Sequence, residues 1–173
     1  VCSSDLAIYC GDSEYFSYVL NRAYVGITVP EDYREYLMEL NALPGKSGFI
    51  TGEYAAGGKA GRNYFTWENG RKIDAVRDRL FHWRKFRQIS QDTYFALMTA
   101  LLEAADRVSN VASVYGAFLK KIKATARKPL ILNAPQILPA PELNVEIYHA
   151  PAEKWSGDFF TDILYLDPPY NGR

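Results

Sequence analysis

Apolar residues along this chain recur with two different periods, one typical of buried strands and one typical of helices. Residues 7–10 form a short apolar run that ends at Gly11 and Asp12, which predicts a buried strand ending in an acid. Apolar residues from 13 to 24 then recur at helical spacing, so we expect a helix directly after that acid. A strand–acid–helix unit therefore opens the chain.

The middle of the chain is predominantly helical by the same criterion. The helical candidates are residues 30–43, 72–86, 91–108 and 111–125. Pro44-Gly45 ends the first of them, and Ser90 is a suitable N-cap for the third. Residues 46–66 are rich in Gly and Tyr and predict a loop or an irregular hairpin. Trp83 falls at helical spacing, which favours a place in the core.

The last part of the chain returns to strand-like periodicity. Residues 128–141 contain several prolines and are expected to connect the helices to a strand over 145–148, where apolar and polar residues alternate. Residues 162–166 are almost continuously apolar, which is typical of a strand covered on both faces. Strands with acids at their carboxyl ends, separated by helices, predict an α/β fold with an open sheet and a helical insertion. In such sheets ligands bind beyond the carboxyl ends of the strands.

Charge adds a local signal to this outline. The 173 residues carry 20 basic and 20 acidic side chains, so the net charge is zero. Basic residues nevertheless gather in two blocks, 62–87 and 107–141, and the second contains no acid. The blocks indicate an anionic partner, with nucleic acid the first candidate, although a solvated helix face explains either block equally well.

The cysteine content, the lengths of the apolar runs and the two ends of the chain add further expectations. Two cysteines are too few for a disulfide framework, and no apolar run is long enough to span a membrane. No signal peptide is evident at the start, so a cytoplasmic protein is expected. Both ends read as truncated. Residues 1–6 (VCSSDL) are similar to a translated sequencing adaptor, and we hypothesise that they are not native.

The strongest chemical motif is Asp167-Pro168-Pro169-Tyr170, followed by Asn171. Two prolines make a stiff turn and lack N–H donors, so its carbonyl oxygens stay available as acceptors. A carboxylate adds another acceptor, and a tyrosine offers a flat face for stacking. This set suits an exocyclic amino group on an aromatic ring, whose attack depends mainly on positioning. The alternative is a rigid turn without a chemical role.

The motif and three further stretches resemble the DNA adenine N6-methyltransferases that carry Asp-Pro-Pro-Tyr. The stretches are residues 11–18 (GDSEYFSY), 69–77 (NGRKIDAVR) and 109–120 (SNVASVYGAFLK). The resemblance covers nearly all of the chain after Leu6. It implies a partial Rossmann-like sheet for S-adenosylmethionine, formed by residues 7–29 and 128–173. It also implies a mainly helical target-recognition region over residues 30–127.

The resemblance also implies roles for individual residues. Asp167 and the Pro168 carbonyl would accept from adenine N6, Pro169 would stiffen the turn, and Tyr170 would stack on a base flipped out of duplex DNA. Asp12 would hold the ribose hydroxyls of S-adenosylmethionine, although a helix N-cap is the alternative role for this acid. The candidate DNA-binding residues are Arg71, Lys72, Arg77, Asn110, Lys120 and Lys121. A C-cap is the alternative role for Asn110. No metal ligand is expected.

The chain departs from that family in two places. A Gly-rich cofactor loop would lie before Val1, so we expect no methyl transfer by residues 1–173 alone. No acid follows the strand at 145–148; His149 stands there, and a structural role is favoured for it. The expected activity is site-specific adenine methylation in a restriction–modification system or by an orphan or phage enzyme, with a cognate endonuclease as a candidate partner. The alternatives are a DNA-binding remnant without catalysis, a cytosine N4 enzyme, an RNA adenine enzyme, or a methyltransferase of protein glutamine, for which Asn rather than Asp167 is usual.

Overall fold

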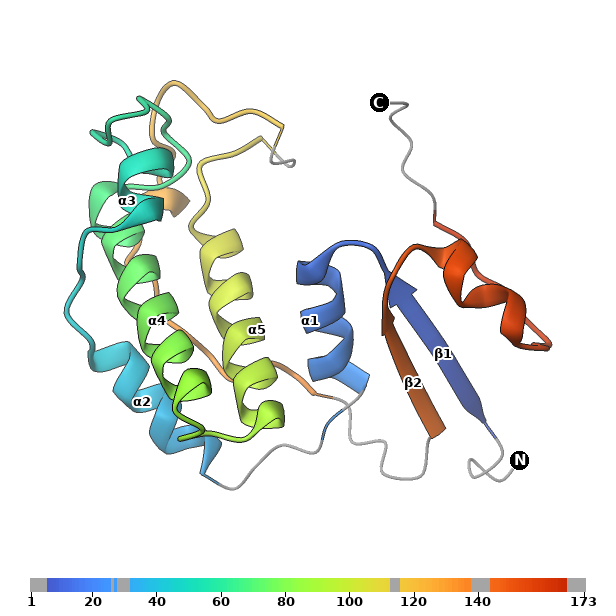
Figure 1. Ribbon diagram of the computed structural model, residues 1–173. Coiled ribbons are helices and arrows are strands. Elements are labelled where there is room, and N and C mark those ends of the chain that lie inside the picture. The colour runs from blue at the N-terminus through green and yellow to red at the C-terminus, as the bar shows by residue number, and fades with distance from the viewer. Residues whose placement is uncertain (1–5, 26, 28–31, 113–115, 138–143, 168–173) are drawn as a thin grey trace.

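The computed structural model describes residues 6–25, 27, 32–112, 116–137 and 144–167. Two strands, β1 (Ala7–Asp12) and β2 (Asn144–His149), lie at one side of the molecule, as Figure 1 shows. Helix α1 (Tyr15–Val25) lies between these strands and a group of helices formed by the middle of the chain. The element order begins with the predicted strand, acid and helix, which confirms that part of the expectation.

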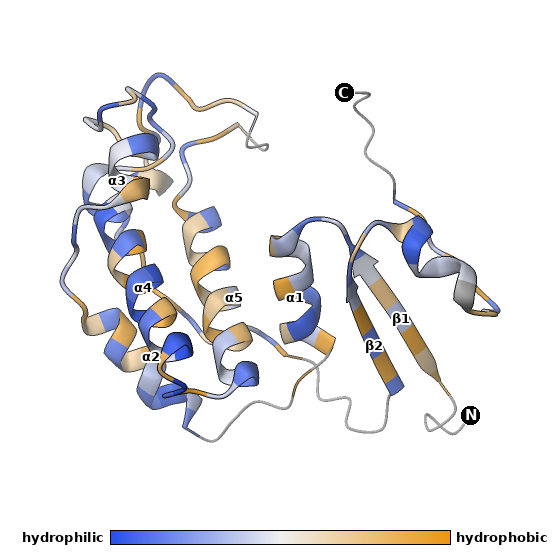
Figure 2. Ribbon diagram, in the orientation of Figure 1, coloured by the Kyte–Doolittle hydropathy of each residue, from blue (hydrophilic) through white to orange (hydrophobic). Residues whose placement is uncertain are grey.

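The two strands are parallel and in continuous register from Ala7↔Asn144 to Asp12↔His149. Parallel strands need a crossover connection, and here that connection contains the whole helical part. Figure 2 shows hydrophobic residues in both strands, and in β2 they alternate with polar ones. A parallel sheet with a helical insertion therefore agrees with the predicted α/β class, although the sheet within the described residues has two strands.

The helical part consists of α2 (Tyr33–Ala42), α3 (Phe49–Tyr54), α4 (Trp67–Lys85) and α5 (Gln91–Arg107). Two of the helices begin at hydroxyl caps. Thr66 accepts from the Asn69 N–H at 3.2 Å, and Ser90 accepts from the Thr93 N–H at 3.0 Å. The predicted cap and the predicted start of α5 are confirmed. α4 begins five residues earlier than its apolar periodicity indicated, because Thr66 supplies the cap.

The hydrophobic core lies where α5 packs against α1, α2 and α4. Phe95 and Leu97 of α5 are fully buried together with Val19 of α1 and Leu80 of α4. Trp83 is 6% exposed and belongs to this core, as its spacing predicted. Leu130 and Leu132 also enter the core, so the segment after α5 packs onto the helices as well as leading to β2.

Two segments differ from the sequence-based expectation in the helical part. The expected loop over 46–66 contains the short helix α3. The expected helix over 111–125 does not form in its described residues, 111–112 and 116–125. There the chain turns back on itself through an antiparallel bridge between Val111 and Phe118, and a short 3-10 helix, η2 (Thr125–Arg127), follows. Val111 is buried and Phe118, Leu119 and Ile122 are partly buried, so apolar residues in this segment need no helix to be covered.

The expected buried strand over 162–166 is a further correction. These residues are not paired in the sheet, and Ile163 and Tyr165 are 86% and 83% exposed. A strand is stabilised by a neighbouring strand edge and by cover on its apolar faces. The described residues provide neither for this segment, so its apolar sequence did not predict its structure here.

Candidate functional site

Asp12 and His149 lie at the carboxyl ends of β1 and β2, where parallel sheets bind ligands. The Asp12 carboxylate accepts a hydrogen bond at 2.8 Å from the N–H of Glu14, the residue before α1, and so closes the turn between β1 and α1. The His149 Nε2 lies 3.2 Å from the Ser13 carbonyl oxygen. The structure therefore brings both residues onto the same turn, which Asp12 stabilises while staying partly exposed.

Aromatic rings from α1 pack around His149. The Tyr15 ring lies edge-on to the imidazole, with centroids 5.3 Å apart, and the Tyr18 ring lies 5.5 Å from it. Tyr15 in turn accepts from the Arg84 guanidinium at 3.2 Å. These contacts give His149 a structural role, as expected, and they join the sheet to the carboxyl end of α4.

The opposite face of β1 is covered by the segment after β2, which includes the short 3-10 helices η3 (Ala152–Lys154) and η4 (Ser156–Asp158). The Trp155 indole stacks on Tyr148 with centroids 5.0 Å apart and lies directly against Gly11. A Cβ at Gly11 would sit 2.8 Å from that indole, so a side chain there would displace Trp155. Glycine before Asp12 was the sequence signal for this close approach, and the aromatic cover itself was missed.

Asp167, the first residue of the chemical motif, is exposed at the end of the described chain. Pro168, Pro169 and Tyr170 lie outside the described residues, so their predicted roles remain predictions. Within the described residues no group of three His, Cys, Asp or Glu side chains is arranged to hold a metal ion. In that same part of the chain, no helix is long and apolar enough to cross a membrane.

Lys72 and Arg71 point from α4 toward the end of α2. The Lys72 ammonium donates to the carbonyl oxygens of Leu40, Asn41 and Leu43 at 2.7–2.9 Å, and burial lowers the pKa of this lysine. Its charge satisfies the unpaired carbonyls at a helix C-terminus. Arg71 donates to the Gly45 carbonyl at 2.8 Å. Both cations therefore hold the α2–α3 connection, which was not foreseen.

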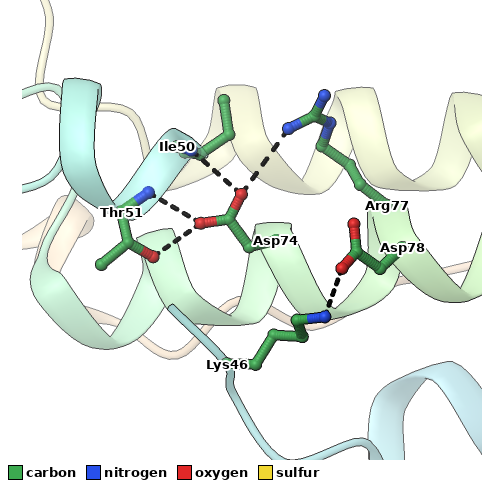
Figure 3. Close-up of polar contacts among 6 residues, drawn as sticks. All are labelled: Lys46, Ile50, Thr51, Asp74, Arg77 and Asp78. Atoms are coloured by element: carbon green, nitrogen blue, oxygen red, sulfur yellow. Dashed lines mark hydrogen bonds and ion pairs between the residues drawn. The ribbon is translucent and has the colours of Figure 1, made fainter. Parts of the chain in front are cut away.

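Arg77 belongs to a polar cluster between α3 and α4, drawn in Figure 3. The buried Asp74 carboxylate accepts from the N–H groups of Ile50 and Thr51 at 2.9 and 2.8 Å and from the Thr51 hydroxyl at 2.6 Å. It thus caps α3 from another helix. Arg77 is half exposed and lies 3.6 Å from Asp74. Lys46 pairs with Asp78 beside it.

Asn110 is completely buried, and its side chain is occupied by main-chain partners. Its amide nitrogen donates to the carbonyl oxygens of Asn63 and Leu119, both at 2.8 Å, and its amide oxygen accepts from the Lys123 N–H at 3.0 Å. These bonds leave it no direct access to DNA. Lys120 and Lys121, by contrast, are exposed on the loop that Asn110 holds.

The chain was compared with known proteins. Residues 5–173 match the family model described as D12 class N6 adenine-specific DNA methyltransferase. The type II methyltransferase M.NlaIII of Neisseria lactamica is 46% identical over 167 residues, 96% of this chain and 50% of that protein. M.CviAII of Paramecium bursaria Chlorella virus 1 is 36% identical over 168 residues, 94% of this chain and 48% of that protein.

A more distant relative is also described as a type II methyltransferase. M.FokI of Planomicrobium okeanokoites is 31% identical over 180 residues, 98% of this chain and 28% of that protein. No solved structure matches the chain significantly. The chain spans about half the length of M.NlaIII and M.CviAII. The family match and the identities together show that the chain belongs to the D12 class N6 adenine-specific DNA methyltransferases.

Proposed function

We propose that the full-length protein transfers a methyl group from S-adenosylmethionine to adenine N6 at specific sites in duplex DNA. The observation that carries this proposal is Asp12, an acid at the carboxyl end of a parallel strand. The chain belongs to this family and contains the motif Asp167-Pro168-Pro169-Tyr170. We place the enzyme in the cytoplasm, as the modification enzyme of a restriction–modification system with a cognate endonuclease or as an orphan or phage methylase.

Asp12 fits the cofactor's ribose by its chemistry. One carboxylate oxygen accepts from Glu14, and within the described residues no hydrogen bond engages the other. A carboxylate with a spare acceptor can bind a ribose hydroxyl. The partly exposed side chain leaves the approach to that oxygen open. S-adenosylmethionine, when bound, supplies an electrophilic methyl group, and no metal takes part in the proposed reaction.

The proposed work of the chain at the target base is positional. Asp167 and the Pro168 carbonyl accept the two N6 hydrogens, Pro169 keeps the turn rigid, and Tyr170 stacks on the flipped adenine. Accepting both hydrogens turns the nitrogen lone pair toward the methyl group and lets N6 attack in line. N6 would form the new bond to carbon as the methyl–sulfur bond breaks, and Asp167 would accept the proton that N6 releases.

Residues 30–127 are proposed as the target-recognition region. Exposed Lys120 and Lys121 are proposed to contact phosphates, and Arg77 is a further candidate because it is half exposed. Lys72, Arg71 and Asn110 are proposed to support that region through the main-chain hydrogen bonds described above, since these bonds occupy their polar groups.

The test is methyl transfer by the full-length protein. Radiolabelled S-adenosylmethionine is supplied with duplex DNA or RNA, and the nucleosides are separated after digestion. We expect label in N6-methyladenine from DNA, abolished by Asp167→Ala and retained by Asp162→Ala, which removes an exposed acid from the same segment. Label in N4-methylcytosine or RNA would reassign the substrate. DNA binding without any label would identify a remnant that has lost catalysis.

A further inference from the structure

The loop between α3 and α4 and the loop after α5 lie at the same end of the helical part, as Figure 1 shows, and a hydrogen bond from Asn110 to Asn63 joins them. Arg62, on the first loop, is exposed, and its guanidinium lies 5.5 Å from the centroid of the Tyr54 ring. Asn63 next to it donates to the Lys120 carbonyl at 3.5 Å. Arg62 thus lies on the loop that contacts the main chain of the Lys120–Lys121 loop.

A row of aromatic rings connects the two loops, and Arg62 lies over one of them. Neighbouring centroids are 5.9 Å apart for Phe49–Tyr54, 5.7 Å for Tyr54–Tyr64 and 5.2 Å for Tyr64–Phe118. Phe49 is 62% exposed, and the other rings of the row are partly exposed. Cations beside partly exposed rings suit a polyanion whose bases and sugars present flat and apolar surfaces.

Within the described residues, no acid pairs with the cations of this surface. Among the residues that the structure describes, no carboxylate lies within ion-pair distance of Arg62, Lys120 or Lys121. The nearby Lys59, in contrast, pairs with Glu53 at 2.9 Å. Three exposed cations without acids are complementary to a phosphate backbone.

The geometry of the first loop is fixed by glycines and by Asp74. Gly57 and Gly61 have positive φ angles of 82° and 64°, which favour glycine. A Cβ on Gly58 would lie 2.6 Å from the Gly52 carbonyl oxygen, so the loop folds closely over the end of α3. Because Asp74 caps α3, as Figure 3 shows, the helix that presents Phe49 and Tyr54 is held to α4.

Asn110 joins the two loops to each other. Besides its side-chain bonds to Asn63, Leu119 and Lys123, its N–H donates to the Tyr64 carbonyl at 2.7 Å and its carbonyl accepts from the Leu119 N–H at 2.9 Å. Removing its amide would break the side-chain bonds to Asn63 and Leu119 and leave the main-chain bonds in place, which would loosen the Lys120–Lys121 loop against the Arg62 loop. The side chain of Asn110 therefore contributes to the spacing of the cations.

We propose that Arg62, Lys120 and Lys121 form a single phosphate-binding surface for duplex DNA, and that Asn110 is the positioning residue that sets its geometry. The inference deepens the proposed function and rests on it. Direct phosphate contacts give Arg62 a role in affinity, while Asn110, which touches no DNA, sets which sequences fit the surface.

The first test measures the salt dependence of DNA binding by the full-length protein, with a fluorescent duplex and polarisation. For Arg62→Ala and for Lys120→Ala we expect severalfold weaker binding at low salt. The slope of log K against log salt is negative, and its magnitude should decrease by about 0.9 for each lost contact. Arg34→Ala, which removes an exposed cation from α2, should leave the slope unchanged. Equal slope changes in all these variants would indicate net charge alone and would overturn the proposed surface.

The second test separates positioning from stability. Asn110→Asp is nearly isosteric but loses the two amide donations, and Asn41→Asp likewise loses an amide donation, to the Leu132 carbonyl at 2.9 Å. Both variants should be less stable. Only Asn110→Asp should lower the ratio of methylation on target over non-target duplexes, with cofactor affinity unchanged. A ratio unaffected by Asn110→Asp, or equally lowered by Asn41→Asp, would overturn the positioning role.

These outcomes are distinguishable from a failure of the proposed function. If wild type neither binds nor methylates DNA, the proposed function itself fails. If wild type methylates DNA while Arg62→Ala and Lys120→Ala behave as wild type, the surface is wrong and the function stands. Should Asn110→Asp not fold, the surface variants still decide the inference, because Arg62 and Lys120 are exposed.

Discussion

Asp12 and His149 are register partners at the ends of the two parallel strands, and their side chains engage adjacent residues of one turn. Asp12 binds the Glu14 N–H, and His149 lies against the Ser13 carbonyl. His149 therefore occupies the end of β2, where an acid was expected from the family, and uses that place to brace the turn that carries Asp12.

A substitution at Asp12 can distinguish its hydrogen bond to Glu14 from its proposed contact with the cofactor. Asp12→Asn keeps an oxygen for the Glu14 N–H but removes the charge, so the turn before α1 should keep its hydrogen bond while S-adenosylmethionine binds more weakly. A hydrogen bond to a charged group contributes about 1.5–3 kcal/mol, which corresponds to roughly a 10- to 100-fold higher Kd. Calorimetric titration of the full-length protein measures this. Glu14→Gln, a change at the neighbouring exposed acid, should bind as wild type does.

Gly11→Ala tests the aromatic cover on β1. A Cβ at this position would lie 2.8 Å from the Trp155 indole, so the ring must move. Overpacking of this kind costs about 1–3 kcal/mol of unfolding free energy. Denaturant unfolding and tryptophan fluorescence should both report the change. Gly157→Ala has open space around its Cβ and should be near neutral. A Trp155→Ala background should remove most of the penalty.

Asp74→Ala should destabilise the protein by about 2–3 kcal/mol, because two main-chain N–H groups and one hydroxyl lose a charged acceptor in a buried place. The exposed Asp78 is its matched control. Asp78→Ala breaks the pair with Lys46, and surface ion pairs contribute about 1 kcal/mol or less. Denaturant unfolding compares the two. Equal losses would mean that Asp74 does not cap α3.

The hydrogen bond of Tyr24 should make the stability of the folded protein depend on pH. Its hydrogen bond to Glu103, with burial and the Glu103 charge adding to it, raises the pKa of Tyr24 to about 12. The unfolded chain loses this proton near its ordinary pKa of about 10, whereas the folded chain keeps it. The stabilisation is therefore complete below about pH 10 and is lost as the pH rises toward 12.

The measurement is the difference in urea midpoint between wild type and Tyr24→Phe across that range. We expect wild type to be more stable below pH 10 and the difference to shrink between about pH 10 and 12. Glu103→Gln removes the acid that raises the pKa and should flatten this dependence. A difference that stays constant to pH 12 would contradict the contribution of Tyr24.

The sequence predicted correctly those elements that are determined by residues close together in the chain. Ser90 caps α5 through its own neighbour, and Asp12 follows directly from an apolar run, so both elements were located correctly. The segment after Asn110 was predicted to be a helix but turns back through the Val111–Phe118 bridge, because the hydrogen bonds of Asn110 with Leu119 and Lys123 fix an irregular course that apolar spacing does not reveal. Contacts between residues far apart in the sequence leave no local signal, as with Lys72 at the end of α2 and Asp74 at the start of α3. The apolar run at residues 163–166 predicted a buried strand, but whether it forms one depends on a neighbouring strand with which it can pair.

Asparagine side chains hold the irregular segment after α5 at several points. Asn110 binds residues 119 and 123, Asn69 binds the main chain of Ala126, Lys128 and Leu130, and Asn41 binds that of Leu132. All of these bonds go to main-chain atoms, so exposed side chains between the anchors do not hold the fold. Exposed positions such as Lys120 and Lys121 can therefore be exchanged in evolution while the anchored main chain and the helices that carry the segment stay the same.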